Sequence, residues 1–254
     1  MSSKIKVLQV IPKLGYGGAE TGCYDIAHYL SEKDCPSYIA TSGGALLKYV
    51  KKNKVKVFRL PVHSKNPFLI LFNTIILTIL ILINNINIIH ARSRAPAWAC
   101  YLACLLTRRK FVTTFHGTYN YKSKLKKFYN SVMVRSKLTI AGSNFIFSHI
   151  NENYNEYLNK KKKLRRIFRG INLDYFNKKN VSILKQEKLK DEWELSSNNF
   201  TILMPGRLTY WKGQEILIEA LNILIEDYNN TNFQAVFLGS DQGRKVYKKK
   251  LLNL

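Results

Sequence analysis

The stretch INIIHARSRAPAWACYLACLLTRRKFVTTFHG, residues 86–117, decides the fold class, because it reads as strand, helix and strand in turn. Its largely apolar runs at 86–90 and 110–115 are typical of strands that are buried on both faces of a sheet. The helix-like segment between them is the crossover that two parallel strands require. This stretch therefore predicts an α/β fold with a parallel sheet.

The same alternation extends through most of the chain. Further strands are expected at 5–11, 37–41, 56–60, 137–142 and 165–170, with helix-like stretches between most of them. The pattern pauses at INLDYFNKKNVS (171–182) and restarts with a polar helix at 183–195, a strand at 200–206, a helix at 213–228, a strand at 232–239 and the basic start of a helix at 244–254. We therefore expect two α/β domains, residues 1–172 and 173–254, of which the second carries only two clear strands.

The chain is strongly basic, with 41 Lys and Arg against 16 Asp and Glu in 254 residues. This surplus favours an acidic partner, although an overall compositional bias explains it equally well. No Asp or Glu occurs from Cys35 to Asn151, a stretch that contains 18 Lys and Arg. A two-carboxylate hydrolytic site or a hard-metal site is therefore excluded from that stretch. The basic runs at 121–130 and 159–169 lack a nucleic-acid motif, so solvated surface is expected there and no nucleic-acid partner.

The four cysteines, Cys23, Cys35, Cys100 and Cys104, form no CxxC pair, and MSSKIKVLQVI at the N-terminus runs straight into a strand without a cleavable signal. A cytoplasmic, reduced protein is therefore expected. Cys100 and Cys104 are one helical turn apart, but no matching Cys or His pair accompanies them. We expect them to be small core residues and expect no metal site.

In open parallel sheets, ligands bind at the carboxyl ends of strands. The loop PKLGYGGAE, after the first strand, contains Gly15, Gly17 and Gly18, which let the backbone approach a ligand at the start of the next helix. A plain flexible turn is the alternative, because a glycine cluster alone is a weak signal. His90 and His116 follow two neighbouring strands and are expected to face this loop, which makes both candidate site residues.

Further cations follow the same strand ends. Arg92 and Arg94 come directly after His90, and Arg169 follows the last strand of the first domain, where a surface position is favoured. In the second domain, PGRLTYWKGQE (205–215) places Arg207 after a strand-end Gly206 and Lys212 directly before a helix. A guanidinium, an ammonium and a helix N-terminus can then converge on one anion, and a diphosphate has the right size.

Five segments in this order and spacing resemble glycosyltransferase family 4 of the bacterial type: GGAE, IIHARSRAPAW, TTFHGTYN, RGINLDYF and PGRLTYWKGQEILIEAL. The resemblance covers nearly the whole chain and implies the GT-B fold, two facing Rossmann-like domains. It also implies a retaining transferase that moves a sugar from a nucleotide-diphosphate donor, UDP- or GDP-linked, to an acceptor hydroxyl without a required metal or cofactor.

The resemblance also assigns roles to individual residues. Arg207 and Lys212, with Gly206, bind the donor diphosphate and stabilise it as it leaves; Gly17 and Gly18 approach donor and acceptor, and His116 reaches the transferred sugar. The family pattern continues into a segment with two glutamates eight positions apart, which this sequence lacks before Leu254. A truncated, non-catalytic remnant that binds nucleotide or membrane is therefore an alternative, and an epimerase of the same fold is another.

The segment 68–83, FLILFNTIILTILILI, lies in a run of 26 residues without a charged side chain, Asn66 to Ala91. As a helix it would span about 24 Å, short of the ~30 Å core of a bilayer. We expect it to lie on an anionic membrane surface or on a partner, helped by Lys48, Lys51, Lys52 and Lys65. This location would suit a glycan or lipid-linked acceptor of the cell envelope, at the inner face of the cytoplasmic membrane.

Overall fold

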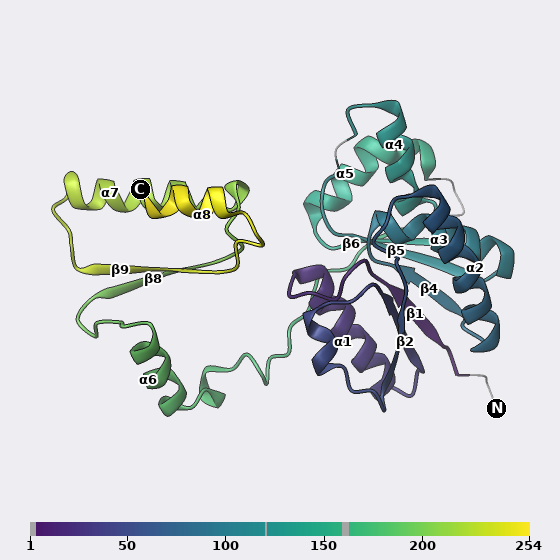
Figure 1. Cartoon of the computed structure of the whole chain (residues 1–254), viewed down its shortest axis with the longest axis horizontal. Coiled ribbons are helices and arrows are strands. Elements are labelled where there is room, and N and C mark those ends of the chain that lie inside the picture. The colour runs from purple at the N-terminus through teal and green to yellow at the C-terminus, as the bar shows by residue number, and fades with distance from the viewer. Residues whose placement is uncertain (1–3, 120, 159–162) are drawn as a thin grey trace. The chain divides into compact units, whose positions relative to one another are not determined.

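The computed structural model describes residues 4–119, 121–158 and 163–254 (Figure 1). Predictions for residues 1–3, for Asn120 at the end of the segment TTFHGTYN and for residues 159–162 of the basic run lie outside the described residues. The chain divides into two compact units, Met1–Gly170 and Ile171–Leu254. This division lies two residues before the boundary expected from the sequence, and each unit is described by itself.

The first unit is built on one parallel sheet of seven strands in the order β3-β2-β1-β4-β5-β6-β7. The strands are β1 (Val7–Val10), β2 (Ser37–Thr41), β3 (Val55–Arg59), β4 (Ile88–Ala91), β5 (Lys110–Phe115), β6 (Leu138–Ala141) and β7 (Lys163–Arg166). The α helices are α1 (Gly18–Glu32), α2 (Pro67–Ile83), α3 (Arg94–Thr107), α4 (Lys124–Ser131) and α5 (Asn144–Tyr154). Short 3-10 turns lie at Ala45–Tyr49, Val132–Val134 and Asn155–Tyr157.

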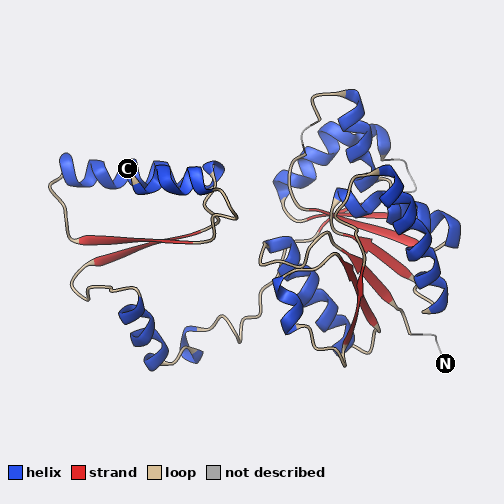
Figure 2. Ribbon diagram, viewed as in Figure 1, coloured by secondary structure: helices blue, strands red, loops and turns tan. Residues whose placement is uncertain are grey.

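Helices lie against both faces of this sheet (Figure 2), and two hydrophobic clusters fill the space between them and the strands. The larger cluster contains Leu77 and Ile81 of α2, the small residues of α3 and Ile150 of α5. The smaller cluster contains Cys23 and Ala27 of α1. Because both faces are covered, central strands such as β1 are buried at every residue, which explains why apolar residues dominate them. The predicted α/β class is confirmed.

The strand order reverses direction between β1 and β4, which pair in parallel from Val7 with Ile88 to Val10 with Ala91. From β1 the chain builds outward to β2 and β3, and then crosses to β4 on the other side. The loops after β1 and β4 therefore lead away from each other and leave a crevice at the carboxyl ends of these strands. The predicted glycine loop and His90 lie at this reversal.

The second unit pairs β8 (Phe200–Pro205) in parallel with β9 (Phe233–Leu238). Its α helices are α6 (Ile183–Glu192), α7 (Gln214–Glu226) and α8 (Lys245–Leu252), with 3-10 turns at Lys178–Asn180 and Tyr210–Lys212. The helices α7 and α8 contact each other through Lys250 and Glu215 and through Tyr247 and Gln214. A parallel pair of strands joined by α7 is the strand, helix and strand unit that the sequence predicts here.

The strand expected at 165–170 is shifted, because β7 runs from Lys163 to Arg166. Its neighbour β6 ends at Ala141, which pairs with Arg166. The Ile167 N–H still donates to the Ala141 carbonyl, at 3.0 Å, but the neighbouring strand β6 ends there. The following residues, including Arg169, therefore leave the sheet and can contact other parts of the unit.

The apolar segment 68–83 forms most of α2, which has 17 residues and packs against α3. Its inner side buries Asn73, Thr74, Leu77 and Ile81, whereas Phe68, at 82 % exposure, begins a row of exposed apolar side chains. The rest of this row is Leu71, Phe72, Ile75, Ile79 and Leu82. Within the described residues, no helix has both the length and the apolar character needed to cross a bilayer.

Candidate functional site

The glycine loop leads directly into α1 at the carboxyl end of β1. Gly17 is the N-terminal cap of α1 and has an extended backbone, with φ −74° and ψ 164°, and Gly18 is the first helical residue. A Cβ atom on Gly17 would overlap the Glu20 carboxylate, and one on Gly18 would lie 2.7 Å from Nη1 of Arg169. The absence of side chains here thus leaves room for charged groups at the start of a helix, where anions are favoured.

Two arginines meet over the first turns of α1. A Cβ atom on Gly22 would lie 2.9 Å from Nη2 of Arg169 and 3.0 Å from Nη2 of Arg92. Arg169 is exposed, in keeping with the surface position expected from the sequence. Its guanidinium also donates a hydrogen bond to Thr21 Oγ1 at 3.3 Å. This cation from the end of the first unit is therefore brought back to the glycine loop at its beginning.

Arg92 is held in place by a buried chain of hydrogen bonds through Gln9 to the backbone of α1. Its Nη1 donates to Gln9 Oε1 at 3.1 Å, and Gln9 Nε2 donates to the Cys23 carbonyl at 2.9 Å. Arg92 is 4 % exposed, and its Nε atom has no hydrogen-bond partner among the described residues. Burial lowers the pKa of Arg92 from its usual value, which the nearby Arg169 also lowers. The fold thus holds a desolvated guanidinium beside the crevice. Desolvation of this charge costs free energy, and a bound anion would lower that cost.

The two candidate histidines lie next to this arginine. His90 is buried in β4, and its Nε2 lies 2.7 Å from Thr114 Oγ1 of β5. Burial, and then the charge of Arg92, holds the pKa of His90 well below its usual value. For His116, after β5, burial followed by Arg92 and Arg169 lowers the pKa to about 3. Both imidazoles are therefore neutral near pH 7, where they can donate or accept hydrogen bonds but carry no charge.

His116 differs from His90 in one respect that matters for ligand binding. Its Nε2 atom is buried and has no hydrogen-bond partner within the described parts of the chain. A buried polar atom without a partner costs free energy, which a ligand hydroxyl could recover by bonding to it. The first unit thus places an unused neutral imidazole, two guanidiniums and a helix N-terminus near the carboxyl ends of β1, β4 and β5.

The second unit has its own strand-end site after β8. The Gly206 N–H donates to the Leu238 carbonyl at 2.8 Å, so the two strands remain paired up to this point. Arg207 follows, and the turn Tyr210–Lys212 leads to Gly213, whose φ of 80° favours glycine, and then to α7. The aliphatic part of Lys212 lies over Gly206, 3.8 Å from where its Cβ would be. Arg207 and Lys212 are both exposed, so their charges are available to a ligand.

Two buried polar residues hold this turn in shape. Gln214, at 0 % exposure, donates from Nε2 to the Arg207 carbonyl at 2.9 Å. Thr209 is 1 % exposed, and the Lys212 N–H donates to its carbonyl at 2.8 Å. These two residues were not predicted as site residues, although a polar Gln at the first position of an apolar helix was a visible signal. They fix the backbone that carries both cations.

The structure thus brings together Gly17, Gly18, His90, Arg92, His116 and Arg169 in the first unit, and Gly206, Arg207 and Lys212 in the second. Arg94 is engaged elsewhere, because its Nη1 donates to Asn130 Oδ1 at 2.9 Å and its guanidinium lies over the Tyr119 ring. Among the described residues, no group of three or more His, Cys, Asp or Glu is placed to hold a metal ion.

Two family models match the chain, one on each side of the unit boundary. The first, Glycosyltransferase Family 4, matches residues 16–175, and the second, Glycosyl transferases group 1, matches residues 185–254. The chain belongs to glycosyltransferase family 4. A comparison with curated proteins gave no match.

Three solved structures are similar to this chain over nearly its whole length. A glycosyltransferase from Rickettsia africae is 38 % identical, with a TM-score of 0.84 over 98 % of this chain and 64 % of its own. Anabaena Alr3699/HepE in complex with UDP-glucose is 20 % identical, with a TM-score of 0.77 over 98 % of this chain and 65 % of its own. The UDP-N-acetylglucosamine 2-epimerase from Rickettsia bellii is 13 % identical, with a TM-score of 0.60 over 99 % of this chain and 65 % of its own.

The last two structures show the fold alone, because their sequence identity to this chain is low. The predicted GT-B class is confirmed by these similarities and by the two parallel sheets. The chain spans a little under two thirds of the length of the glycosyltransferases to which it is similar.

Proposed function

We propose that this family 4 chain is the acceptor domain and part of the donor domain of a retaining glycosyltransferase that uses a nucleotide-diphosphate sugar. The observation that carries the proposal is the turn from Gly206 to Gly213, which presents Arg207 and Lys212 between a strand end and the start of α7. A guanidinium, an ammonium and a helix N-terminus in one turn form a site for a diphosphate. That UDP-glucose is bound by Anabaena Alr3699/HepE supports a UDP-sugar, and GDP is the other candidate.

Arg207 and Lys212 would act mainly in the transition state. When the anomeric bond breaks, negative charge develops on the leaving diphosphate. Cations already held by a rigid turn stabilise this charge without reorganisation, and one such contact contributes several kcal/mol in typical enzymes. We assign both residues to donor binding and to leaving-group stabilisation, with Gly206 providing close backbone access.

The first unit would bind the sugar and the acceptor. Gly17 and Gly18 keep the start of α1 open, and His116 would form a hydrogen bond through its unpartnered Nε2 to a hydroxyl of the transferred sugar. Arg92 and Arg169 add positive charge at the same helix terminus. No Asp or Glu lies between Cys35 and Asn151, so that stretch cannot supply a carboxylate nucleophile. The proposed mechanism does not need one from there.

The acceptor would be a glycan or a lipid-linked molecule of the cell envelope, reached from the inner face of the cytoplasmic membrane. The exposed apolar row on α2 supports this part of the proposal, since interfacial helices bury such a face among headgroups. Beside it, α2, α3 and α4 enclose an apolar groove of about 340 Å³ lined by Lys65, Ile70, Leu71, Trp98, Leu102 and Phe128. Lys65 belongs to this surface, whereas Lys48 lies in the turn Ala45–Tyr49 and the Lys51 N–H donates to His28 of α1.

The donor part is tested by calorimetric titration with UDP, GDP and ADP. The variant Arg207→Ala/Lys212→Ala should lose at least about 2 kcal/mol of diphosphate binding, because two charged contacts are removed. The control Lys185→Ala/Lys188→Ala, on exposed residues of α6, removes the same net charge and should bind normally. Absence of binding by a folded wild-type chain, or equal losses in both variants, would reject this assignment.

The membrane part is tested separately by sedimentation with anionic vesicles. Phe68→Ser/Leu71→Ser removes two exposed side chains of the α2 row, and Ile183→Ser/Leu184→Ser removes two exposed side chains of α6. Only the first variant should lose vesicle binding. If wild-type protein ignores anionic vesicles altogether, the membrane location is wrong, and the donor assignment is unaffected.

A further inference from the structure

A second cavity lies at the amino ends of β5 and β6, on the edge of the sheet opposite the glycine loop. It measures about 220 Å³ and is lined by Tyr101, Cys104, Leu105 and Phe111 together with five cations. The cations are Arg108, Arg109, Lys110, Arg135 and Lys137. No Asp or Glu lines it, in keeping with the stretch from Cys35 to Asn151, which contains neither. The cavity is therefore bordered by positive charge and has no internal counter-charge.

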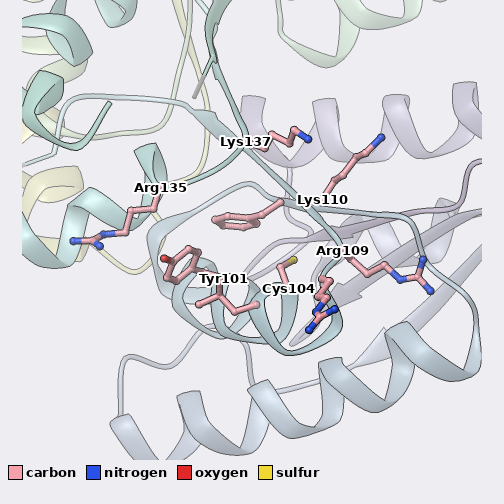
Figure 3. Close-up of a pocket in the computed structure, with 9 residues that line it drawn as sticks. Tyr101, Cys104, Arg109, Lys110, Arg135 and Lys137 are labelled. Carbon is pink, nitrogen blue, oxygen red and sulfur yellow. The ribbon is translucent and has the colours of Figure 1, made fainter. Parts of the chain in front are cut away.

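Arg135 is already occupied. Its guanidinium lies over the rings of Trp98, Phe128 and Tyr157 at 5.1 to 5.8 Å from their centroids, and its Nε donates to Ser131 Oγ at 3.0 Å. Figure 3 shows it directed away from Arg109, Lys110 and Lys137. The remaining four cations are the ones available to a ligand.

These four cations have no carboxylate partner in the described parts of the chain. None of them takes part in the ion pairs there, whereas Lys127, on α4, pairs with Glu156 at 3.1 Å. Arg109 Nε is buried and lacks a hydrogen-bond partner among the described residues. Lys110 is the first residue of β5 and Lys137 directly precedes β6, and the Lys137 N–H donates to the Phe111 carbonyl. Arg108, Lys110 and Lys137 are exposed and Arg109 is half-buried, so water weakens the repulsion among their charges. The buried Arg109 Nε still lacks an acceptor, which an anion in the cavity would supply.

We infer that this cavity binds a phosphate group through the cations that border it, Arg108, Arg109, Lys110 and Lys137. Arginine and lysine together are the usual phosphate ligands, and an oxygen bound by Arg109 Nε would satisfy that donor. The phosphate could belong to a soluble molecule or to a lipid headgroup. The site lies at the opposite edge of the sheet from the glycine loop, so it does not depend on the proposed transfer reaction.

The test measures binding of inorganic phosphate by calorimetry and of phosphatidylglycerol vesicles by sedimentation, at fixed ionic strength. Arg109→Gln/Lys137→Gln should weaken phosphate or vesicle binding by about tenfold or more, the typical loss for charged hydrogen bonds. Lys185→Gln/Lys188→Gln lowers the net charge equally on α6 and should change binding less than about twofold, as expected for screened surface charges. Arg207→Ala/Lys212→Ala should also retain this binding, which separates it from the donor residues.

The two ligand sources give different results. If the ligand is a soluble phosphate, calorimetry should detect binding that added vesicles do not reduce. If the ligand is a lipid headgroup, vesicle binding should depend on Arg109 and Lys137 even where free phosphate binds weakly. Either result supports the site. Equal losses in the cavity variant and the α6 control, or no binding to phosphate and vesicles by folded wild-type protein, would overturn it. A loss confined to Phe68→Ser/Leu71→Ser would assign vesicle binding to α2 and also reject the headgroup at this cavity.

Discussion

His90 Nε2 lies 2.7 Å from Oγ1 of Thr114, so a buried hydrogen bond joins the neighbouring strands β4 and β5 close to the carboxyl edge of the sheet. This bond fixes the orientation of an imidazole that lies beside Arg92. Since both partners are buried, removal of one leaves the other without a partner in a site that water does not readily reach.

Replacement of Thr114 by Val keeps the shape of the side chain and removes the hydroxyl. We expect the free energy of unfolding of the first unit to fall by about 1–3 kcal/mol, the cost of an unsatisfied buried polar group. Urea denaturation followed by circular dichroism measures the change. Thr118→Val, at an exposed position of the same unit, is the matched control and should stay within about 0.5 kcal/mol. Equal losses in the two variants would show that the bond contributes nothing particular.

The two buried histidines predict a loss of stability in acid. Both have pKa values below that of an unfolded histidine, near 6.5, and that of His116 is about 3. The unfolded chain therefore takes up protons that the folded chain does not. This stabilising contribution is complete above pH 6.5 and is lost as the pH falls from 6.5 towards 3. Each such group contributes a slope of at most about 1.4 kcal/mol per pH unit.

The measurement is a series of urea unfolding curves between pH 7.5 and pH 4.5. His90→Gln/His116→Gln removes both groups and should flatten the decline in the unfolding free energy over this range, whatever its effect at pH 7.5. His63→Gln, at an exposed histidine, serves as the control. A decline of the same slope in the double variant would mean that other groups cause it.

Two glycines of the first unit should respond differently to replacement by Ala. At Gly18 the new Cβ would meet only the flexible end of Arg169, and Ala also favours the helix, so stability should be maintained within about 1 kcal/mol. At Gly44, φ is 136° and the Cβ would overlap the Leu14 backbone, so we expect a loss of about 2 kcal/mol or more. Thermal unfolding of both variants checks the contrast. Equal losses would contradict it.

The positions of the strands could be predicted from the sequence because they are local properties. The strand-like runs SYIAT (37–41) and KFVTTF (110–115) coincide with β2 and β5, because short runs rich in apolar, aromatic and β-branched residues favour strands wherever they lie in the chain. The strand expected at 165–170 overlaps β7 only at Arg165 and Arg166, because the end of an edge strand depends on where its neighbour ends. Ala141 of β6 sets that limit, and nothing near Arg165 in the sequence indicates it.

The contacts that shape the site could not be predicted in the same way. Arg169 reaches Thr21 across 148 positions, and Arg92 reaches Gln9 across 83. Both contacts follow from the strand order and register, which bring distant segments to one edge of the sheet. Gln214 and Arg207 are close in the sequence, but the bond between them depends on the left-handed backbone at Gly213.

Gln214 should affect donor binding without contacting the donor. In Gln214→Met the side-chain volume is nearly kept, but the Arg207 carbonyl loses the bond that positions it. We expect diphosphate binding to weaken by about 1–2 kcal/mol, with a similar loss of stability in the second unit. Gln234→Met, which removes bonds to the Ser196 carbonyl and to Thr201 away from this turn, is the control. Calorimetry with the diphosphate that binds the wild type compares the two, and an unchanged affinity in Gln214→Met would show that the turn keeps its shape without this bond.

The four cysteines should differ sharply in their reaction with a thiol reagent. Cys23, Cys100 and Cys104 are buried, and for Cys100 and Cys104 this agrees with the core positions expected from the sequence. Burial raises the pKa of Cys23 and of Cys104 to about 12. The thiolate is the reactive form, so all three should react only when the first unit unfolds. Cys35 is partly exposed and should react first, with one equivalent released in native buffer and four in denaturant. Cys35→Ser should abolish the native reaction, and a rapid equivalent that remains in this variant would mean that the interior opens around α1 or α3.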